Sequence, residues 1–468
     1  MLSPRFQYRA RIGRLVEAAV WLLIAGVFWQ TWCVDGLIVP CRVASGSMAP
    51  CLLGPHRRVV CADCGYAFDH DGADDAAGRR AVCPLCGFAD NPLKSWPPVG
   101  GDRIVIHKSI FALRPPRRWE VVAFRHPARA SEIVVKRVVG LPGESVQVLG
   151  GDVYVDGQIQ RKTFEQQQAL AILVDDADRH LAQSPSPPPR WIPEGAWGAA
   201  RGRFAHPASG PNEPVDWLVY RHWRRPAGAG DTIEEGAVTD ICGQAQSRSR
   251  REEDVHRVVD LMLSLRLVEA TGPGWLILRA TDGREQFDVR LNPKDGRYQV
   301  LQNDQPVPAA QGRLPGSTRG LRVVVSLFDR QFLLALDGRP VVTWPYEPSD
   351  RPLTTPSRPL AVGAQGPWVV IEELKVYRDV YYTTPIGHEQ RAGLAGPVTL
   401  GEGADAQYYV LGDWSFISED SRNWSAAPGL PGRLIVGKPL IVLFPPKPVS
   451  LGRWSIQIPD ISRIRYIR

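Results

Sequence analysis

The chain has 468 residues, of which 22% are charged and 44% are hydrophobic, and its formal net charge is +7 at pH 7. This length predicts two or three folded domains, and the composition excludes a disordered chain, a coiled coil and a polytopic transporter. The basic surplus is small and forms no basic block, so nucleic acid is not an expected partner.

The first predicted element is an apolar segment at residues 15–34, which follows an arginine-rich stretch at residues 1–14. About 20 residues suffice to cross a bilayer core, so we expect one transmembrane helix in cytoplasmic (inner) membrane lipid. The basic amino-terminal flank predicts a cytoplasmic N-terminus and places the rest of the chain on the outer, periplasmic side. A cleaved secretory signal is the alternative, but no small-x-small site precedes Asp35.

Residues 36–60 follow this segment and contain the sequence SGSMAP at residues 45–50. A turn of small residues exposes a hydroxyl group and leaves backbone N–H groups free to bind an oxyanion. Ser-Gly-Ser is also common in linkers, and the sequence does not match the Gly-x-Ser-x-Gly elbow. This turn alone therefore does not identify a catalytic serine, and other motifs are needed to support that interpretation.

Residues 61–94 contain two Cys-x-x-Cys-Gly motifs, formed by Cys61 and Cys64 and by Cys83 and Cys86. Two such motifs 18 residues apart are typical of a zinc ribbon, in which four thiolates form a closed structural site. Disulfides or free thiols are the alternative, because the expected compartment is oxidising. The remaining cysteines have no partner pattern; they are Cys33, Cys41, Cys51 and Cys242.

Residues 95–165 read as short strands rich in valine and isoleucine, at 103–107, 119–124, 133–139 and 145–148. Lys136 interrupts the third of these strands and shares a face with Val134 and Val138. Burial would lower the pKa of this lysine and make it a usable base near neutral pH. The strand alone favours the alternative, an edge lysine that discourages aggregation.

A long insertion is predicted at residues 166–394. It begins with irregular, proline-rich and charged linker sequence around residues 180–255. Alternating segments joined by Asp-Gly turns then predict an antiparallel β-sandwich within about residues 181–380. The predicted strands are 258–267, 275–280, 286–291, 298–302, 321–328, 331–336, 339–344 and 369–377. Four tryptophans could form a ligand patch but are more typical of a core; they are Trp191, Trp197, Trp217 and Trp223.

The last predicted segment, residues 395–468, again reads as short apolar strands, like residues 95–165. It carries Gly412-Asp413 and then the sequence SEDSR at residues 418–422, which could be a solvated turn or a site held by charge-assisted hydrogen bonds.

The order of the motifs along the chain is more informative than any single motif. The apolar segment is followed in turn by SGSM, by KRVVGLPG at 136–143 and by GD-x₄-S-x-DSR at 412–422. This order resembles bacterial type I signal peptidase, a membrane-bound serine endopeptidase with a Ser/Lys dyad. The resemblance covers residues 1–60, 95–165 and 395–468. It implies an all-β catalytic core, preprotein signal peptides as substrates cut after small residues, and no cofactor for catalysis.

By position, the resemblance makes Ser47 the nucleophile and Lys136 its general base, with an acyl-enzyme intermediate. It implies that the Ser47 amide and the Ser45 hydroxyl form the oxyanion hole. Ser418 would orient the lysine, and Asp420 and Arg422 would support the site. The Gly412-Asp413 pair opens that last motif.

The chain also departs from the family pattern. It has Trp414 where asparagine is usual, Phe111 where tyrosine is common and Cys51 where threonine is usual. The sandwich resembles the laminin-G/concanavalin fold, with an unknown ligand. Two alternatives stay open. One is a Ser/His/Asp hydrolase that uses His107 or His126, and the other is a membrane-anchored carbohydrate- or protein-binding module with an inactive peptidase core.

Overall fold

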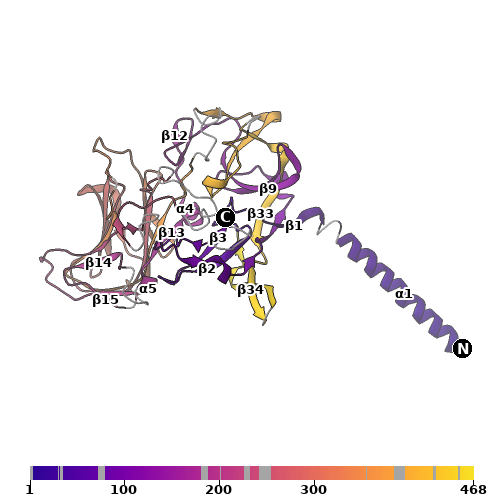
Figure 1. Ribbon diagram of the computed structural model, residues 1–468, viewed down its shortest axis with the longest axis horizontal. Coiled ribbons are helices and arrows are strands. Elements are labelled where there is room, and N and C mark those ends of the chain that lie inside the picture. Colours follow the sequence, from indigo (N-terminus) through magenta and orange to yellow (C-terminus); the bar gives the residue numbers. More distant parts are fainter. Residues whose placement is uncertain are drawn as a thin grey trace.

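The computed structural model describes most of the chain, and its described residues are mainly β-strand, as the sequence predicts. The described residues are 4–29, 31, 35–71, 80–180, 188–200, 202–225, 232–241, 255–354, 356–383, 396–424, 428–451 and 454–467. Cys33, Cys242 and most of the two predicted linker sequences, 184–189 and 247–253, lie outside them. Figure 1 shows two bodies of strands side by side, with the long helix α1 pointing away from both.

Helix α1 spans Pro4–Phe28, so it includes most of the arginine-rich start as well as most of the apolar segment predicted at residues 15–34. The arginine-rich start has good helix formers and continues the same helix. Among the described residues, no helix is both long and apolar enough to cross a membrane. The large apolar side chains between Val16 and Trp29 are exposed.

The first body, here called the core region, is built on an eight-stranded antiparallel sheet in the order β1-β7-β33-β8-β9-β31-β32, with β36 paired to β33. Its strands are β1 (Ile38–Arg42), β7 (Arg103–His107), β8 (Val121–His126), β9 (Arg129–Gly140), β31 (Gln407–Leu411), β32 (Leu430–Pro431), β33 (Ile435–Val442) and β36 (Arg465–Tyr466). The sheet therefore joins segments that lie before and after both predicted insertions.

Smaller elements flank this sheet. A four-stranded sheet contains β10 (Ser145–Leu149), β11 (Asp152–Val155), β12 (Gln158–Ile159) and β30 (Val398–Thr399). A hairpin of β34 (Pro446–Leu451) and β35 (Trp454–Pro459) lies near the C-terminus. Short helices are α2 (Asp35–Leu37), α3 (Ile110–Leu113), α4 (Phe164–Leu170) and α5 (Ala177–His180).

The cysteine-containing segment forms its own small unit. Its strands are β2 (His56–Val60), β3 (Ala67–Asp71), β4 (Arg80–Ala81), β5 (Asn91–Pro92) and β6 (Pro98–Val99). β2 pairs with β3 and β6, and β4 pairs with β5. Because β2 follows the SGSMAP turn directly, this unit is continuous with the candidate serine loop.

The second body is an antiparallel sandwich of two sheets. One sheet contains β13 (Ile172–Asp176), β15 (Gly198–Ala200), β16 (Arg203–His206), β20 (Leu261–Thr271), β25 (Leu321–Phe328), β26 (Gln331–Leu336), β27 (Arg339–Pro345) and β29 (Trp368–Arg378). The other contains β14 (Trp191–Glu194), β17 (Asp216–Tyr220), β21 (Trp275–Thr281), β22 (Gln286–Asn292), β23 (Arg297–Gln302), β24 (Gln305–Arg313) and β28 (Leu360–Gln365). A separate pair is β18 (Trp223–Arg224) and β19 (Glu234–Glu235).

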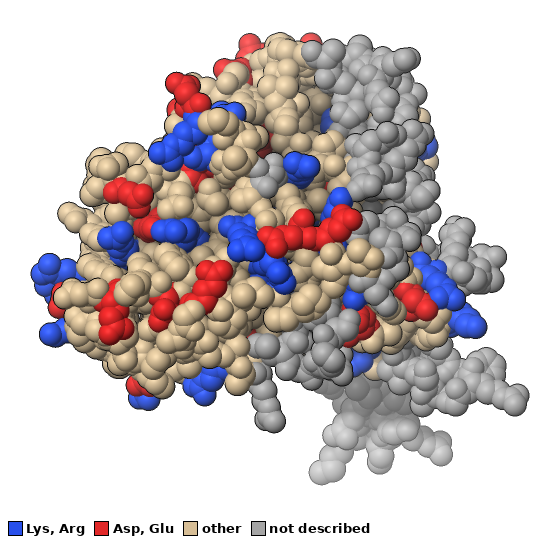
Figure 2. Space-filling view, turned by 60° about the vertical axis from the view of Figure 1, so that its left-hand side comes forward, with Lys and Arg blue, Asp and Glu red and all other residues tan. Residues whose placement is uncertain are grey.

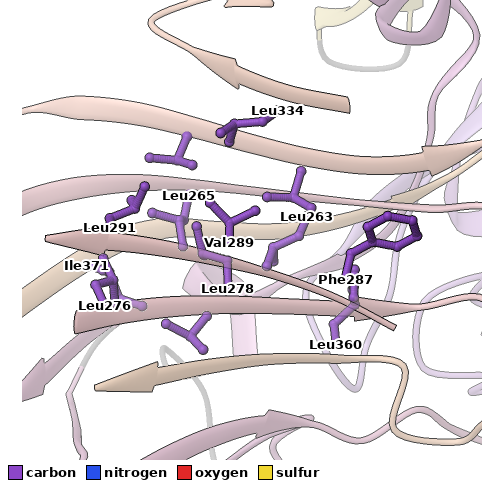
Figure 3. Packing of buried hydrophobic residues seen from close by; sticks show 14 of the residues in the cluster. Leu263, Leu265, Leu276, Leu278, Phe287, Val289, Leu291, Leu334, Leu360 and Ile371 are labelled. Carbon is purple, nitrogen blue, oxygen red and sulfur yellow. The ribbon is translucent and has the colours of Figure 1, made fainter. Parts of the chain in front are cut away.

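Apolar side chains from both sheets share one core, in which Leu265 and Ile371 of one sheet lie close to Leu276 and Val289 of the other (Figure 3). Trp191, Trp197 and Trp223 are buried, as expected for core residues. Trp217 is half-buried, with the Arg279 guanidinium 4.3 Å from its ring centroid.

Eight predicted strands of the sandwich correspond to observed ones, but the region before residue 255 contains strands that the sequence did not predict. β13 to β17 lie where irregular linker was expected from residue 180 onward, or just before it. Both β24 and β28 were also missed. Basic and acidic side chains are interspersed on the face of the molecule in Figure 2. In the sandwich, Arg266 and Arg322 form ion pairs with Glu373 at 2.9 and 2.7 Å.

A buried lysine connects the sandwich to the core region. Lys162 Nζ lies 2.6 Å from Asp329 Oδ1 and 2.7 Å from Asp379 Oδ2, and 4.6 Å from the centroid of the Trp119 ring. Both carboxylates belong to turns or strand ends of the sandwich, whereas Trp119 precedes β8 of the core sheet. Charge pairing of this kind fixes the two bodies to each other.

Candidate active site

The structure brings Ser47 and Lys136 into contact, although 89 residues separate them in the chain. Ser47 lies in the turn between β1 and β2, and Lys136 lies in the middle of β9, opposite Val122 of β8. Lys136 Nζ is 2.6 Å from Ser47 Oγ, and both side chains are buried. A lysine amine at this distance can exchange a proton with the serine hydroxyl.

Burial changes the protonation chemistry of Lys136. The side chain is 2% exposed, and its pKa is lowered from the usual 10.5 to about 8, with burial as the largest cause. The negative charge of Asp420 opposes this effect but does not cancel it. A substantial fraction of the amine is therefore neutral near pH 8, as a general base requires.

Asp420 and Arg422 form a buried ion pair behind this dyad. Arg422 donates from Nε to Asp420 Oδ1 at 2.8 Å and from Nη2 to Asp420 Oδ2 at 2.6 Å. Burial would raise the pKa of Asp420, but the Arg422 guanidinium outweighs it and holds that pKa below its usual value. Asp420 Oδ2 also accepts from the Gly412 amide at 2.9 Å.

Ser418 joins the same network through Asp420. Its hydroxyl donates to Asp420 Oδ2 at 2.6 Å. The expected contact between Ser418 and Lys136 is not among the hydrogen bonds found for the described residues. Ser418 is thus placed to orient Asp420, whose charge acts on Lys136.

Gly412 occupies a position where no larger residue has room. A Cβ atom there would lie 2.2 Å from Ser418 Oγ and 2.5 Å from the Ser47 carbonyl oxygen. The next residues hold the serine loop, because the Trp414 amide donates to the Ser47 carbonyl at 3.0 Å. The Trp414 ring, one of the departures from the family pattern, packs with Ala49 and Leu53.

Sequence reasoning named Asp413 but missed its partner, Arg137. These residues lie 276 positions apart and form a two-bond ion pair at 2.7 Å for each bond, with both side chains almost fully buried. Arg137 also donates to the Trp119 carbonyl at 2.7 Å. The available signal was the alternation of β9, which places Arg137 on the face opposite Lys136 and so calls for a buried counter-charge.

The chain that leaves the sandwich also reaches the site, which sequence reasoning missed entirely. Thr383 follows β29, and its amide donates to Ser415 Oγ at 2.7 Å. The Arg422 guanidinium donates to both the Thr383 carbonyl and Ser415 Oγ. The ion pair behind the dyad is therefore held in part by the end of the second insertion.

Ser45 lies at the open side of the candidate site. It is exposed, and its Oγ is 3.3 Å from Ser47 Oγ. A hydroxyl in this position can donate to an oxygen of a bound substrate next to the nucleophile.

The two histidines considered as alternative bases are engaged elsewhere. His126 Nε2 lies 3.3 Å from Glu419 Oε1, and its ring packs edge-on against Trp424. His107 belongs to β7 and pairs with Ile38 and Lys438 across the sheet. Neither ring hydrogen-bonds to Ser47 among the described residues, so the Ser/His/Asp alternative lacks its base.

The four motif cysteines lie together. Cys61, Cys64, Cys83 and Cys86 are all buried, and their sulfur atoms lie within 4.8 Å of one another. The remaining described cysteines, Cys41 and Cys51, are half-buried and lie apart from this group.

Comparison with known proteins supports the resemblance that the sequence predicts. The family model described as "Signal peptidase, peptidase S26" matches residues 14–196, which include Ser47 and Lys136. Signal peptidase I of Leptolyngbya laminosa is 40% identical over 73 residues, or 14% of this chain and 36% of that protein. Probable signal peptidase I-2 of Synechocystis sp. is 41% identical over 69 residues, or 14% of this chain and 31% of that protein.

The chain thus spans about a third of the length of the curated relatives it matches, and the similarity to signal peptidase I is confirmed for that part. Among solved structures, carbohydrate-binding module CBM66 from Bacillus subtilis covers 40% of this chain and 94% of its own, at 10% identity and a TM-score of 0.26. Crh5 transglycosylase in complex with NAG covers 53% and 92%, at 12% identity and a TM-score of 0.29. Similarities of this size say nothing about the ligand or activity of the sandwich.

Proposed function

We propose that this chain is a serine endopeptidase that removes signal peptides from exported preproteins by cutting after small residues. The observation that carries the proposal is the contact of 2.6 Å between Lys136 Nζ and Ser47 Oγ, in which the amine is buried and has a pKa of about 8. The match of residues 14–196 to the signal peptidase family supports the substrate class.

In the proposed reaction, neutral Lys136 accepts the proton of the Ser47 hydroxyl while Oγ attacks the carbonyl carbon of the scissile bond. The Ser45 hydroxyl and the Ser47 amide stabilise the negative charge on the carbonyl oxygen. The lysine ammonium then gives its proton to the leaving amine, and an ester on Ser47 remains. Water hydrolyses this ester, with Lys136 again acting as base, and the enzyme is restored.

The surrounding ion pairs explain how a buried amine can serve in this role. Asp420 is neutralised by Arg422, and Asp413 is neutralised by Arg137, so neither carboxylate is free to form a close ion pair with Lys136. A close, unshared carboxylate would raise the pKa of the lysine and keep it protonated. The two arginines thus allow burial to dominate.

The proposal includes work at a membrane surface, where preproteins emerge. The exposed apolar side chains of α1, among them Trp21, Leu22 and Leu23, support attachment to lipid. Flotation of the full chain with lipid vesicles should depend on residues 4–28. Vesicle binding that survives their removal would contradict this part and leave the peptidase proposal intact.

The deciding experiment is cleavage of a preprotein by the full chain and by the variants Ser47→Ala and Lys136→Ala. Each substitution should abolish cleavage at the signal-peptide site, whereas Ser95→Ala and Lys94→Ala should not, since both control residues are exposed. Cleavage that survives Ser47→Ala or Lys136→Ala would refute the dyad. A folded wild-type chain that cleaves no preprotein would favour the binding-module alternative.

A further inference from the structure

We infer that Cys61, Cys64, Cys83 and Cys86 bind one Zn²⁺ ion, and that this zinc-held unit seats the sandwich through its contacts with Arg190, Trp223 and Arg225 of the insertion. The zinc-held unit is the part of the cysteine-containing segment at residues 61–93, of which the structure describes 61–71 and 80–93. It includes β3, β4 and β5 but not β2 or β6. The inference does not depend on the proposed peptidase activity, because it concerns a different cluster of side chains and its first readout is metal content.

The spacing of the sulfur atoms is that of a tetrahedral four-thiolate site. Cys61 Sγ and Cys86 Sγ are 3.5 Å apart, and Cys64 Sγ and Cys83 Sγ are 3.7 Å apart. A tetrahedral zinc ion with Zn–S bonds of about 2.3 Å requires sulfur–sulfur edges of about 3.8 Å. A disulfide requires about 2.05 Å, so the observed spacing favours a shared ion over two disulfides.

The backbone of both motifs is shaped in the same way. Gly65 donates to the Cys61 carbonyl at 3.0 Å, and Gly87 donates to the Cys83 carbonyl at 2.8 Å. Both glycines have positive φ, 68° and 72°, which turns the chain sharply after the second cysteine of each motif. Two equivalent turns thus present two thiols each to one centre.

The small size of the unit gives a physical reason for a metal. Its core contains the four cysteines and a few apolar side chains, such as Phe68, Leu85 and Leu93, between strands of two to five residues. Units of fewer than about 40 residues usually need a metal or disulfides to hold a fold. Soft thiolate ligands in this geometry select zinc or iron, and zinc is the usual occupant of a closed structural site.

The same unit carries the contacts to the insertion. Trp223 is 1% exposed and packs into the cysteine core, although it belongs to β18. Arg190, which precedes β14 of the sandwich, donates from Nη2 to the Leu85 carbonyl at 2.6 Å and to the Trp223 carbonyl at 2.9 Å. Arg225 donates to Asp63 Oδ2 at 2.8 Å.

Two buried arginines of the insertion lie beside the cysteine motifs, Arg190 at the second motif and Arg225 at the first. Each of them also faces a carboxylate, because Arg190 lies 3.6 Å from Asp175 and Arg225 lies 2.8 Å from Asp63. The insertion therefore adds hydrogen bonds and ion pairs, as well as apolar packing, to the cysteine-containing unit.

The test starts with the full wild-type chain, purified without added chelator, and measures metal by elemental analysis and thiol state by intact mass. About one equivalent of zinc with reduced cysteines is expected. Cys86→Ser should lose most of the zinc, while Cys41→Ser, which changes a half-buried thiol elsewhere, should retain it. Iron in place of zinc, or a mass deficit that shows disulfides among the four cysteines, would overturn the inference.

The seating role has its own readout, which is hydrogen exchange of the wild-type chain before and after zinc removal by a chelator. Exchange should rise in residues 61–71, 188–194 and 223–225, and stay unchanged in β25 and β26, which lie inside the sandwich. Re-addition of zinc should reverse it. A rise confined to residues 61–93 would refute the seating role and retain the metal site.

Discussion

Replacing Lys136 by methionine separates the catalytic use of a buried lysine from its effect on stability. The pKa of Lys136 is about 8 against the usual 10.5, mainly because burial disfavours the ammonium form. At about 1.4 kcal/mol per pKa unit, holding the buried amine protonated costs the folded state about 3 kcal/mol. Methionine keeps the length and packing of the side chain without the charge. K136M should therefore lose proteolysis and gain stability.

Because the pKa of Lys136 is lowered on folding, the pH range in which this lysine destabilises the folded state can be stated. Because the folded-state pKa is the lower one, the cost is full below about pH 8, shrinks as pH rises toward 10.5, and is absent above it. The gain from K136M in urea unfolding should accordingly be about 3 kcal/mol at pH 7 and smaller at pH 9. In the wild type, the rate of cleavage should rise with pH through about 8, since the neutral amine is the active form.

Lys162 provides a matched control, because it is as deeply buried but has two carboxylate partners. Burial would lower its pKa, but Asp329 and Asp379 outweigh burial and raise it. K162M should therefore destabilise the protein, by about 3–5 kcal/mol, because it leaves buried carboxylates unpaired. If K136M proves less stable than the wild type at pH 7, or cleaves preprotein within about tenfold of it, the assignment of Lys136 as a neutral buried base fails.

Three further substitutions test the remaining parts of the site. G412A should abolish cleavage and destabilise the fold by about 1–3 kcal/mol, because its Cβ would meet Ser418 and Ser47. The control G236A, whose Cβ has open space, should change neither the melting temperature nor the rate of cleavage. D413N should lower the free energy of unfolding by about 3–5 kcal/mol, since it leaves the Arg137 charge buried without its partner, and an unchanged urea midpoint would contradict that role. S45A should lower kcat by about 100-fold while the melting temperature stays constant, because the exposed hydroxyl acts on the transition state; an unchanged kcat would remove Ser45 from the oxyanion hole.

The parts of the site that sequence predicts are those in which one residue type is improbable in its local setting. Lys136 stands out because it interrupts a run of valine and isoleucine, and the structure places it in contact with Ser47. The pair of Asp420 and Arg422 is two residues apart and so can be recognised locally. The catalytic roles of these residues stay predictions until cleavage is measured.

Pairings between distant segments were beyond sequence reasoning, because nothing local specifies the partner. Arg137 and Asp413 each read as an ordinary charged residue, and only the pairing of β9 with β31 brings them together. By contrast, the bond from the Ser418 hydroxyl to Asp420 joins residues two positions apart, and the predicted role of Ser418 in orienting Lys136 stays a prediction.

Strands were predicted well where alternation was regular and missed where proline or glycine obscured it. β25 and β26 have the predicted bounds, 321–328 and 331–336. β24 contains Pro306 and Pro308, and lies at the edge of its sheet, where missing N–H groups are tolerated. β28 is short and carries Gly363, whose missing side chain admits the Trp217 ring.

The exit from the sandwich connects the insertion physically to Lys136. Asp379, just after β29, binds Lys162, and four residues later the Thr383 carbonyl accepts from Arg422. Arg422 in turn neutralises Asp420, whose charge is the largest effect opposing the lowered pKa of Lys136. A shift of the sandwich that loosened Thr383 would free Arg422 to move and would expose Lys136 to a less compensated carboxylate. That change would raise the pKa of the lysine and reduce its neutral fraction, so the position of the insertion and the strength of the base are physically linked.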